Sequence, residues 1–246
     1  MKFLKNHPFA VEAYFKRTLV LTFAIPKEQL QDRIPPCLQL DTFQDTWAFI
    51  AVAMVQTEAL RPKGFPKWMG NDFFLIGYRI FVRFTTQEGK RLRGLYILKS
   101  ETNKKRMEVL GNIFTHYQYT TTDIQQSENT IKSIQSGFNI RTDETDSVIN
   151  LPEGSPFKDW KEARRFAGPL PHTFSWLKER NQVLIIRGIR QNWKPQPVKI
   201  SEYQISFLEQ LNLPDIQLAS AFDIRNIPYH WEKGKLAVWK PTDSPL

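Results

Sequence analysis

The sequence predicts a mainly β protein in which antiparallel strands carry a few short helices. The chain has 246 residues, and its 18 Phe, 7 Tyr and 7 Trp give an aromatic-rich core, which favours sheets over helix bundles. Short apolar segments alternate with turn signals along most of the chain. No linker separates them, so we expect one domain over residues 1–246.

The first half begins with a strand at 17–25. Pro26 then opens a short helix, which ends before a pair of prolines. Residues 46–57 form a continuous apolar run, typical of a strand that is buried on both faces. A Pro/Gly-rich loop is expected at 58–72, and a loop of this length is often functional.

The next segment predicts a hairpin of strands 73–86 and 91–100, with a turn at Glu88-Gly89. Asn103 can then cap a helix. Four apolar residues fall on one face of this helix, and two tyrosines alternate in the strand that follows: Met107, Leu110, Ile113, Phe114, Tyr117 and Tyr119.

The second half opens with a more polar stretch at 123–150, where we expect short edge strands. A second helix is predicted from Ser155 to just before Gly168. A hairpin at 173–190, a strand at 198–207, a short helix that ends at a proline and a last group of strands complete the chain.

The net charge of +9 and the pI near 9.6 raise the question of an anionic partner. The Lys and Arg residues are scattered rather than interleaved with aromatic residues in a groove-like pattern. We therefore interpret the charge as a solvated basic surface and do not expect nucleic acid as the partner. The single cysteine, Cys37, excludes an internal disulfide and a multi-cysteine zinc site, but its reactivity stays open.

The sequence shows no signal peptide, and its longest apolar run, 47–55, is too short to span a bilayer. We expect a cytoplasmic protein without a membrane partner. Dinucleotide, phosphate-loop and serine-hydrolase motifs are absent, and the four histidines show no metal-ligand spacing. We therefore expect no cofactor and no metal.

Arg79 lies inside an apolar strand, in the segment IGYRIFVRF. A buried charge is costly unless it is paired. One interpretation is that the guanidinium binds a carboxylate, whose planar geometry it matches. The alternatives are that Arg79 pairs with a buried acid such as Glu58, or that it points to solvent.

Three more residues are candidates for the same site. Glu58 ends the apolar strand and could serve as an acid or base if its environment raised its pKa, although it could equally be an ordinary strand-end charge. His116 could donate a proton into a cavity and Tyr117 a hydrogen bond. The alternative is that His116 and Tyr117 are packed core residues.

Trp193, in the segment QNWKPQP, follows a turn-rich stretch. It is a candidate to line the mouth of a barrel and contact a ligand, and the alternative is an aromatic cap on the core.

The order of these elements resembles a known family. The segments that carry the resemblance are IPKEQLQDRIPPCLQLDTF, TWAFIAVAMV, GNDFFLIGYRIFVR, RGLYILKSET, FTHYQYT, GSPFKDWKEARRFA and RNQVLIIRGIRQNWKPQPVKI. Together they are similar to domain-of-unknown-function family 2071, which belongs with the acetoacetate decarboxylase-like proteins. The resemblance covers most of residues 12–235.

The resemblance implies a closed antiparallel β-barrel or sandwich of the acetoacetate decarboxylase-like type with an internal cavity, and Arg79 stands at the family's strand arginine. True acetoacetate decarboxylases carry a Schiff-base lysine just after the helix. Here that junction reads Thr115-His116-Tyr117-Gln118. Because an amine is needed to form the iminium, we do not expect Schiff-base decarboxylation.

We therefore expect a protein that binds a small organic acid, with Arg79, Tyr117 and Trp193 as ligand-binding residues. If it is an enzyme, Glu58 and His116 are the acid–base candidates, acting on a keto acid. Two other classes stay open: a basic protein that binds nucleic acid or an anionic surface, and a non-catalytic structural oligomer with a filled barrel. A homo-oligomer is compatible with each of them.

Overall fold

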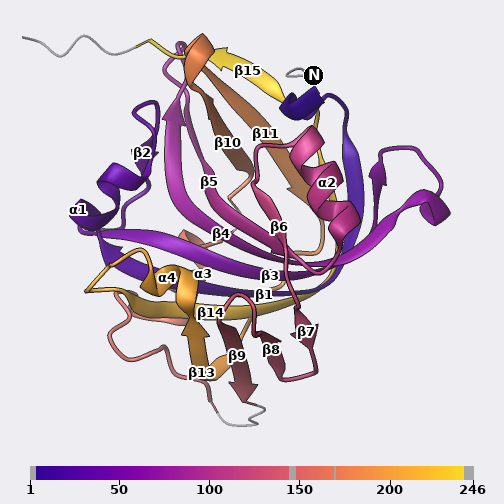
Figure 1. Ribbon diagram of the computed structural model, residues 1–246. Helices are drawn as coiled ribbons and strands as arrows, with labels where there is room; N and C mark the ends of the chain where they lie inside the picture. Colours follow the sequence, from indigo (N-terminus) through magenta and orange to yellow (C-terminus); the bar gives the residue numbers. More distant parts are fainter. Residues whose placement is uncertain (1–3, 144–147, 169, 241–246) are drawn as a thin grey trace, which may run out of the picture.

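The computed structural model of the protein describes residues 4–143, 148–168 and 170–240. Its main feature is a large curved sheet in which most strands follow the order β12-β14-β1-β3-β4-β5-β10-β11-β15 (Figure 1). β2 and β6 pair with β4 and β5 beside this path. The strands of this sheet are β1 (Val11–Pro26), β2 (Gln39–Leu40), β3 (Trp47–Pro62), β4 (Asn71–Thr85), β5 (Arg91–Thr102), β6 (Tyr119–Thr121), β10 (His172–Leu177), β11 (Gln182–Arg190), β12 (Gln196–Pro197), β14 (Gln217–Trp231) and β15 (Lys235–Val238).

The strand pairings form a ring. β14 pairs with β1 along most of its length and also pairs with β11 at its far end. The β11–β14 pairing joins Gly188 to Trp231, Ile189 to His230 and Arg190 to Tyr229. The path therefore closes from β11 back onto β14, as a barrel requires. The predicted mainly β, acetoacetate decarboxylase-like class is confirmed.

One neighbouring pair in the ring is not antiparallel, which differs from the expectation of a fully antiparallel barrel. β10 runs parallel to β5, pairing His172 with Gly94. The two backbones approach closely here, because a Cβ atom on Gly94 would lie 2.4 Å from the carbonyl oxygen of His172. A parallel pair needs a long connection, and residues 103–171 supply it.

The sheet is buried on both faces where β1, β3 and β4 lie side by side. On β4, alternate residues such as Ile76, Tyr78 and Ile80 belong to the main hydrophobic core, while Arg79 and Phe81 face a cavity. The apolar run of β3 is buried without interruption from Ala48 to Val55, so the predicted doubly buried strand is confirmed.

A second, smaller sheet covers the outer face of the large one, next to β14 (Figure 1). Side chains of both sheets share one core cluster, which includes Leu21 of the first sheet and Phe138 of the second. The shared cluster shows that the two sheets pack directly on each other. A single domain over residues 1–246 stays a prediction. The strands of the smaller sheet are β7 (Gln125–Gln126), β8 (Thr130–Ser133), β9 (Phe138–Asp143) and β13 (Lys199–Ile205).

The helices are short, as expected. None of those in the described ranges has the length and apolar character needed to cross a membrane. They are η1 (Leu4–Asn6), α1 (Lys27–Leu30), η2 (Gln31–Arg33), η3 (Lys67–Met69), α2 (Lys105–Phe114), α3 (Trp160–Phe166), η4 (Lys178–Arg180) and α4 (Ser206–Glu209).

Two predicted helix starts are wrong. Asn103 does not cap α2, because its side-chain oxygen accepts a hydrogen bond from the backbone N–H of Phe74 at 2.8 Å. The second helix does not start at Ser155, whose hydroxyl donates to the carbonyl of Ala219 at 2.7 Å. α3 starts after Asp159, which accepts from the backbone N–H of Glu162 as an N-cap.

The expected loop at 58–72 is shorter in the structure, because the strands on either side extend into it. β3 continues to Pro62, and β4 begins at Asn71. The strand register shifts between Thr57 and Leu60, where Ala59 has a φ of 51°. A bulge of this kind keeps the pairing while it re-aims the side chains beyond it.

Cys37 lies in the main core and is buried. Burial raises the pKa of its thiol from 9.0 to about 12. Because the thiolate is the reactive form, we expect little reactivity from Cys37 near neutral pH.

Candidate functional site

The large sheet encloses a cavity of about 430 Å³ between its strands and α2. Within the described part of the chain, its lining holds neither a carboxylate nor a lysine. Every strongly basic group that lines it is an arginine. These cationic residues are Arg61, Arg79, Arg106, Arg164 and Arg190, and His7 also reaches the cavity.

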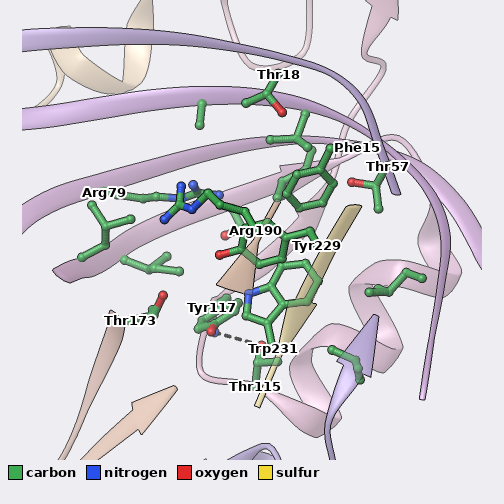
Figure 2. Close-up of a pocket in the computed structure, with 18 of the residues that line it drawn as sticks. Phe15, Thr18, Thr57, Arg79, Thr115, Tyr117, Thr173, Arg190, Tyr229 and Trp231 are labelled. Carbon is green, nitrogen blue, oxygen red and sulfur yellow. Dashed lines mark hydrogen bonds between the residues drawn. The ribbon is translucent and has the colours of Figure 1, made fainter. Parts of the chain in front are cut away.

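Arg79 is the central cation. Its guanidinium points into the cavity from β4 (Figure 2). No described residue forms an ion pair or a hydrogen bond with this side chain, and its buried Nε atom has no partner. Burial lowers the pKa of Arg79, and the neighbouring Tyr229, Tyr119 and Tyr117 act in the opposite direction. Such a buried, unpaired cation is costly, so an anion in the cavity would be stabilised.

The local strand geometry sets the position of Arg79. The pairing of β4 with β5 shifts register between Tyr78 and Arg79. Gly77, two residues before Arg79 on the same face, leaves space for the guanidinium: a Cβ atom there would lie 2.9 Å from Nη2 and 3.0 Å from Nε. Gly77 is therefore a positioning residue for the cation.

We expect Gly77→Ala to displace the Arg79 side chain without unfolding the protein. The added methyl meets the end of a flexible side chain rather than backbone, so the guanidinium must move to relieve the contact. Affinity for a bound carboxylate should fall about tenfold, because the charge stays but its geometry changes. Isothermal titration of the variant measures this loss. Gly89→Ala lies at a turn with open space around it, but its φ of 78° makes the substitution strained, so it is a control for a loss of stability that leaves the cavity unchanged.

Arg190 of β11 is the second interior cation (Figure 2). Its Nη2 donates to the carbonyl of Leu170 at 3.0 Å, and its guanidinium carbon lies 4.6 Å from the Trp193 ring centroid and 5.6 Å from that of Tyr229. Burial lowers the pKa of Arg190, Tyr229 counteracts this, and the positive charge of Arg79 lowers the pKa further. The two guanidinium groups are close enough to repel each other, so one anion can relieve both.

Two buried tyrosines add hydrogen-bond donors. Burial raises the pKa of Tyr117, and it raises the pKa of Tyr119 from 10.0 to about 12. Both phenols therefore stay protonated at neutral pH. The Tyr117 hydroxyl lies near Thr173 (Figure 2), and this neighbour acts to lower the pKa of Tyr117. The hydroxyl nevertheless forms no hydrogen bond with a described residue.

Three aromatic rings form a group beside the cations, which we call the aromatic shelf: Phe15, Tyr229 and Trp231 (Figure 2). Tyr229 stacks on Phe15 with ring centroids 4.7 Å apart and packs on Trp231 at 4.4 Å. Gly188 of β11 permits this arrangement, since any side chain there would collide with the Tyr229 hydroxyl. The shelf gives the cavity an apolar wall next to its charged centre.

His7 lies at the η1 end of the cavity and is 5% exposed. Burial lowers its pKa from 6.5 to about 4. Between these pH values the unfolded chain binds a proton that the folded protein does not. His7 therefore contributes stability that is complete above pH 6.5 and is lost as the pH falls toward 4.

We expect His7→Asn to flatten this pH dependence. Urea unfolding of both proteins at about pH 7 and about pH 5 measures the difference. His116 and His172, whose pKa values burial also lowers, should retain part of the slope. The control is His230→Asn, in a half-buried residue of β14 that does not line the cavity. An unchanged slope in His7→Asn would show that His7 is protonated in the folded state.

The structure brings together three of the five predicted site residues. Arg79, Tyr117 and Trp193 all line the cavity. Glu58 does not line it, and its carboxylate lies 3.8 Å from Lys16 with 40% of the side chain exposed. His116 does not line it either, and its Nε2 lies 3.2 Å from Asn6 Oδ1. The acid–base roles of Glu58 and His116 stay predictions that their placement does not support.

Sequence reasoning missed Arg190, Tyr119 and Tyr229 as site residues. The signal for Arg190 was present, because it ends the apolar strand QVLIIRGIR much as Arg79 interrupts its own strand. Tyr119 follows Tyr117 at the spacing of one strand face, which was a usable signal, although Tyr117 itself lies in the bend before β6. For Tyr229 the sequence offers no signal, because only the closure of β14 on β11 brings it to the cavity.

The family profile of domain-of-unknown-function family 2071, described as "Uncharacterized conserved protein (COG2071)", matches residues 12–232. The chain belongs to this family. No curated protein matches the sequence significantly. The resemblance seen in the sequence is therefore confirmed at the level of the family.

Solved structures show the same fold. An acetoacetate decarboxylase from Legionella pneumophila has a TM-score of 0.56 at 10% identity, covering 94% of this chain and 88% of its own. An acetoacetate decarboxylase-like enzyme from Sphingomonas wittichii has a TM-score of 0.54 at 10% identity, covering 95% and 94%. The enduracididine biosynthesis enzyme MppR, solved with pyruvate, has a TM-score of 0.54 at 9% identity, covering 93% and 90%. At these identities the likeness concerns the fold.

Proposed function

We propose that this family member binds a small organic acid in the cavity, with Arg79 as the main anion-binding group. The observation that carries the proposal is an arginine that faces the cavity and whose buried Nε atom has no partner among the described residues, in a cavity whose described lining has no carboxylate. Arginine matches a carboxylate through two parallel N–H donors. The pyruvate complex of MppR, which shares the fold, supports a small acid as occupant.

The remaining polar groups of the cavity fit the same kind of ligand. Four further lining residues have a buried polar atom without a hydrogen-bond partner among the described residues: His7 Nδ1, Thr18 Oγ1, Tyr117 Oη and Trp193 Nε1. Each of these groups can donate a hydrogen bond. Donors without acceptors favour a ligand that supplies oxygen acceptors.

The proposal is limited to binding. Schiff-base chemistry needs an amine, and the described lining contains no lysine. Glu58 and His116, the acid–base candidates, lie outside that lining. The filled-barrel alternative fits less well, because the cavity measures about 430 Å³. The cytoplasmic location, the absence of a nucleic-acid partner and a homo-oligomeric state stay predictions.

A thermal-shift screen tests the proposal. The panel contains keto, hydroxy and fatty acids at fixed ionic strength, each paired with its primary amide. We expect one class of acid to raise Tm by roughly 5–10 °C at about 100 times its Kd, and the amides to raise it far less. A protein that no acid stabilises, or that acids and amides stabilise equally, would contradict the proposal.

Borohydride reduction in the presence of a keto acid tests the missing lysine directly. We expect no increase in the protein's mass, because no described side chain in the cavity can form an iminium. A trapped adduct on a lysine would show that the cavity opens to a residue outside its lining.

A further inference from the structure

The cavity is larger than a short keto acid requires. Its volume of about 430 Å³ falls within the range of roughly 300–1,000 Å³ in which pockets bury ligands of drug size. A ligand of three or four carbons would contact the cationic centre and leave most of the remaining wall uncovered. The size of the cavity therefore calls for a ligand with a second, larger part.

The lining separates into a polar and an apolar region. Arg79, Arg190 and the Tyr117 hydroxyl form the polar centre described above. Toward α2 the walls are mostly apolar, and we call this region the apolar arm: Leu60, Phe73, Met107, Leu110 and Phe114. Three of these residues come from the helix, whose apolar stripe covers the cavity instead of filling it. Arg106 of the same helix also lines the cavity, but it is exposed.

The aromatic shelf joins the two regions. Tyr229 contacts the Arg190 guanidinium on one side and Trp231 on the other. Trp231 packs against the hydrophobic cluster that contains Phe73 and Met107 of the apolar arm. A molecule that leaves the cations along this wall therefore meets aromatic rings first and aliphatic side chains next.

The apolar arm leads to the surface. Phe9 and Met69 line the cavity and are 37% and 42% exposed. Phe9 packs edge-on against Phe114 of α2, with ring centroids 5.3 Å apart. Side chains that are both exposed and part of the lining mark the opening, so the apolar arm also forms an apolar entrance.

We propose that the ligand is an amphipathic monoanion, a carboxylic acid that carries an aryl group or a medium-length alkyl chain. Its carboxylate binds Arg79 and Tyr117, and its apolar part lies on the aromatic shelf and extends into the apolar arm. Arg190 already donates to Leu170, so of these two interior arginines only Arg79 has no described hydrogen-bond partner and can give its donors to one carboxylate. This inference rests on the proposed function and names the chemical class of its ligand.

A homologous series of straight-chain monocarboxylates, from acetate to dodecanoate, tests the inference by isothermal titration below their micelle concentrations. We expect Kd to fall roughly three- to fourfold for each added CH₂ until the arm is full. The matching primary alcohols should bind far more weakly, since they lack the charge. Dicarboxylates of equal length should also bind more weakly, because their second charge would enter the apolar arm.

Two variants locate the alkyl chain. Leu110→Trp fills the arm, so the series should stop gaining affinity at a shorter chain while acetate binds as before. The matched control is Val109→Trp, one residue away on the exposed side of the same helix, which should leave the series unchanged. If Leu110→Trp does not fold, Leu110→Ser should reduce the gain per CH₂.

The outcomes separate this inference from the proposed function. If short acids bind but Kd is independent of chain length, or if dicarboxylates bind more tightly, the amphipathic class is overturned and acid binding stands. An identical response of Leu110→Trp and Val109→Trp would remove the arm from the site. If no acid binds, or alcohols bind as well as acids, both proposals fail.

Discussion

Arg79→Met should weaken acid binding strongly and at the same time stabilise the unliganded protein. Removing one partner of a buried charge pair costs about 2–5 kcal/mol of binding, so affinity for a carboxylate should fall by a factor of roughly 30 or more. Without a ligand the guanidinium has no described counter-ion. Methionine fills similar space without a charge, so the burial cost of the charge disappears and the free energy of unfolding should rise.

Titration with the best acid of the panel and urea unfolding without ligand measure the two effects. Arg91→Gln, at an exposed arginine on the neighbouring strand β5, should change neither. Arg79→Lys should fall between the wild type and Arg79→Met in affinity, because it keeps the charge and loses the planar pair of donors. Unchanged affinity in Arg79→Met would move the anion to another cation, and a loss of stability would mean that Arg79 has a structural role.

Of the substitutions proposed for this protein, we expect Asp41→Ala to lower the free energy of unfolding most. The Asp41 carboxylate is fully buried and binds Arg83 through one oxygen at 2.5 Å and Arg93 through the other at 2.6 Å. Arg93 also donates to the carbonyl of Phe166 at the end of α3. Removing one member of a buried ion pair costs about 3–5 kcal/mol, which corresponds to a fall in Tm of roughly 6–20 °C for a chain of this size. This is the upper bound here, because Arg83 and Arg93 are 34% and 39% exposed and water can solvate them in part.

Thermal unfolding of Asp41→Ala and Asp45→Ala provides the comparison. Asp45 pairs with Lys27 at 2.7 Å, but its side chain is 85% exposed, so its loss should cost at most about 1 kcal/mol. Neither aspartate lines the cavity, so acid affinity should be unchanged in both variants. Similar small losses of Tm would show that solvent reaches the Asp41 cluster and screens its charges.

Periodicity predicted those parts of the fold in which local pattern and burial agree. The apolar run of β3 and the hairpin of β4 and β5 are of this kind, and the structure confirms them. The pairing of β5 with β10 and the ring closure by β11 and β14 join segments far apart in the sequence. Without the family resemblance, no local signal specifies either pairing.

The same contrast between local and long-range signals explains which site residues could be predicted from the sequence. Arg79 could be recognised because a charge inside an apolar strand stands out on its own. His116 and Tyr117 are adjacent in the bend between α2 and β6, and the geometry of a bend cannot be predicted from periodicity. Only Tyr117 faces the cavity, and His116 contacts Asn6 instead. Glu58 likewise alternates with Thr57, which lines the cavity, so its carboxylate turns toward Lys16.

The seam between β11 and β14 has a consequence for the dynamics of the barrel. It consists of three residue pairs, and two of them include Arg190, Tyr229 or Trp231. A short edge contact of this kind opens locally more easily than the long pairing of β1 with β14. A ligand that contacts Arg190, Tyr229 and Trp231 would hold β11 and β14 together and make this local opening rarer. Amide hydrogen exchange at 188–190 and 229–231 would then slow with occupancy, which makes this short joint of the barrel a reporter of what the cavity contains.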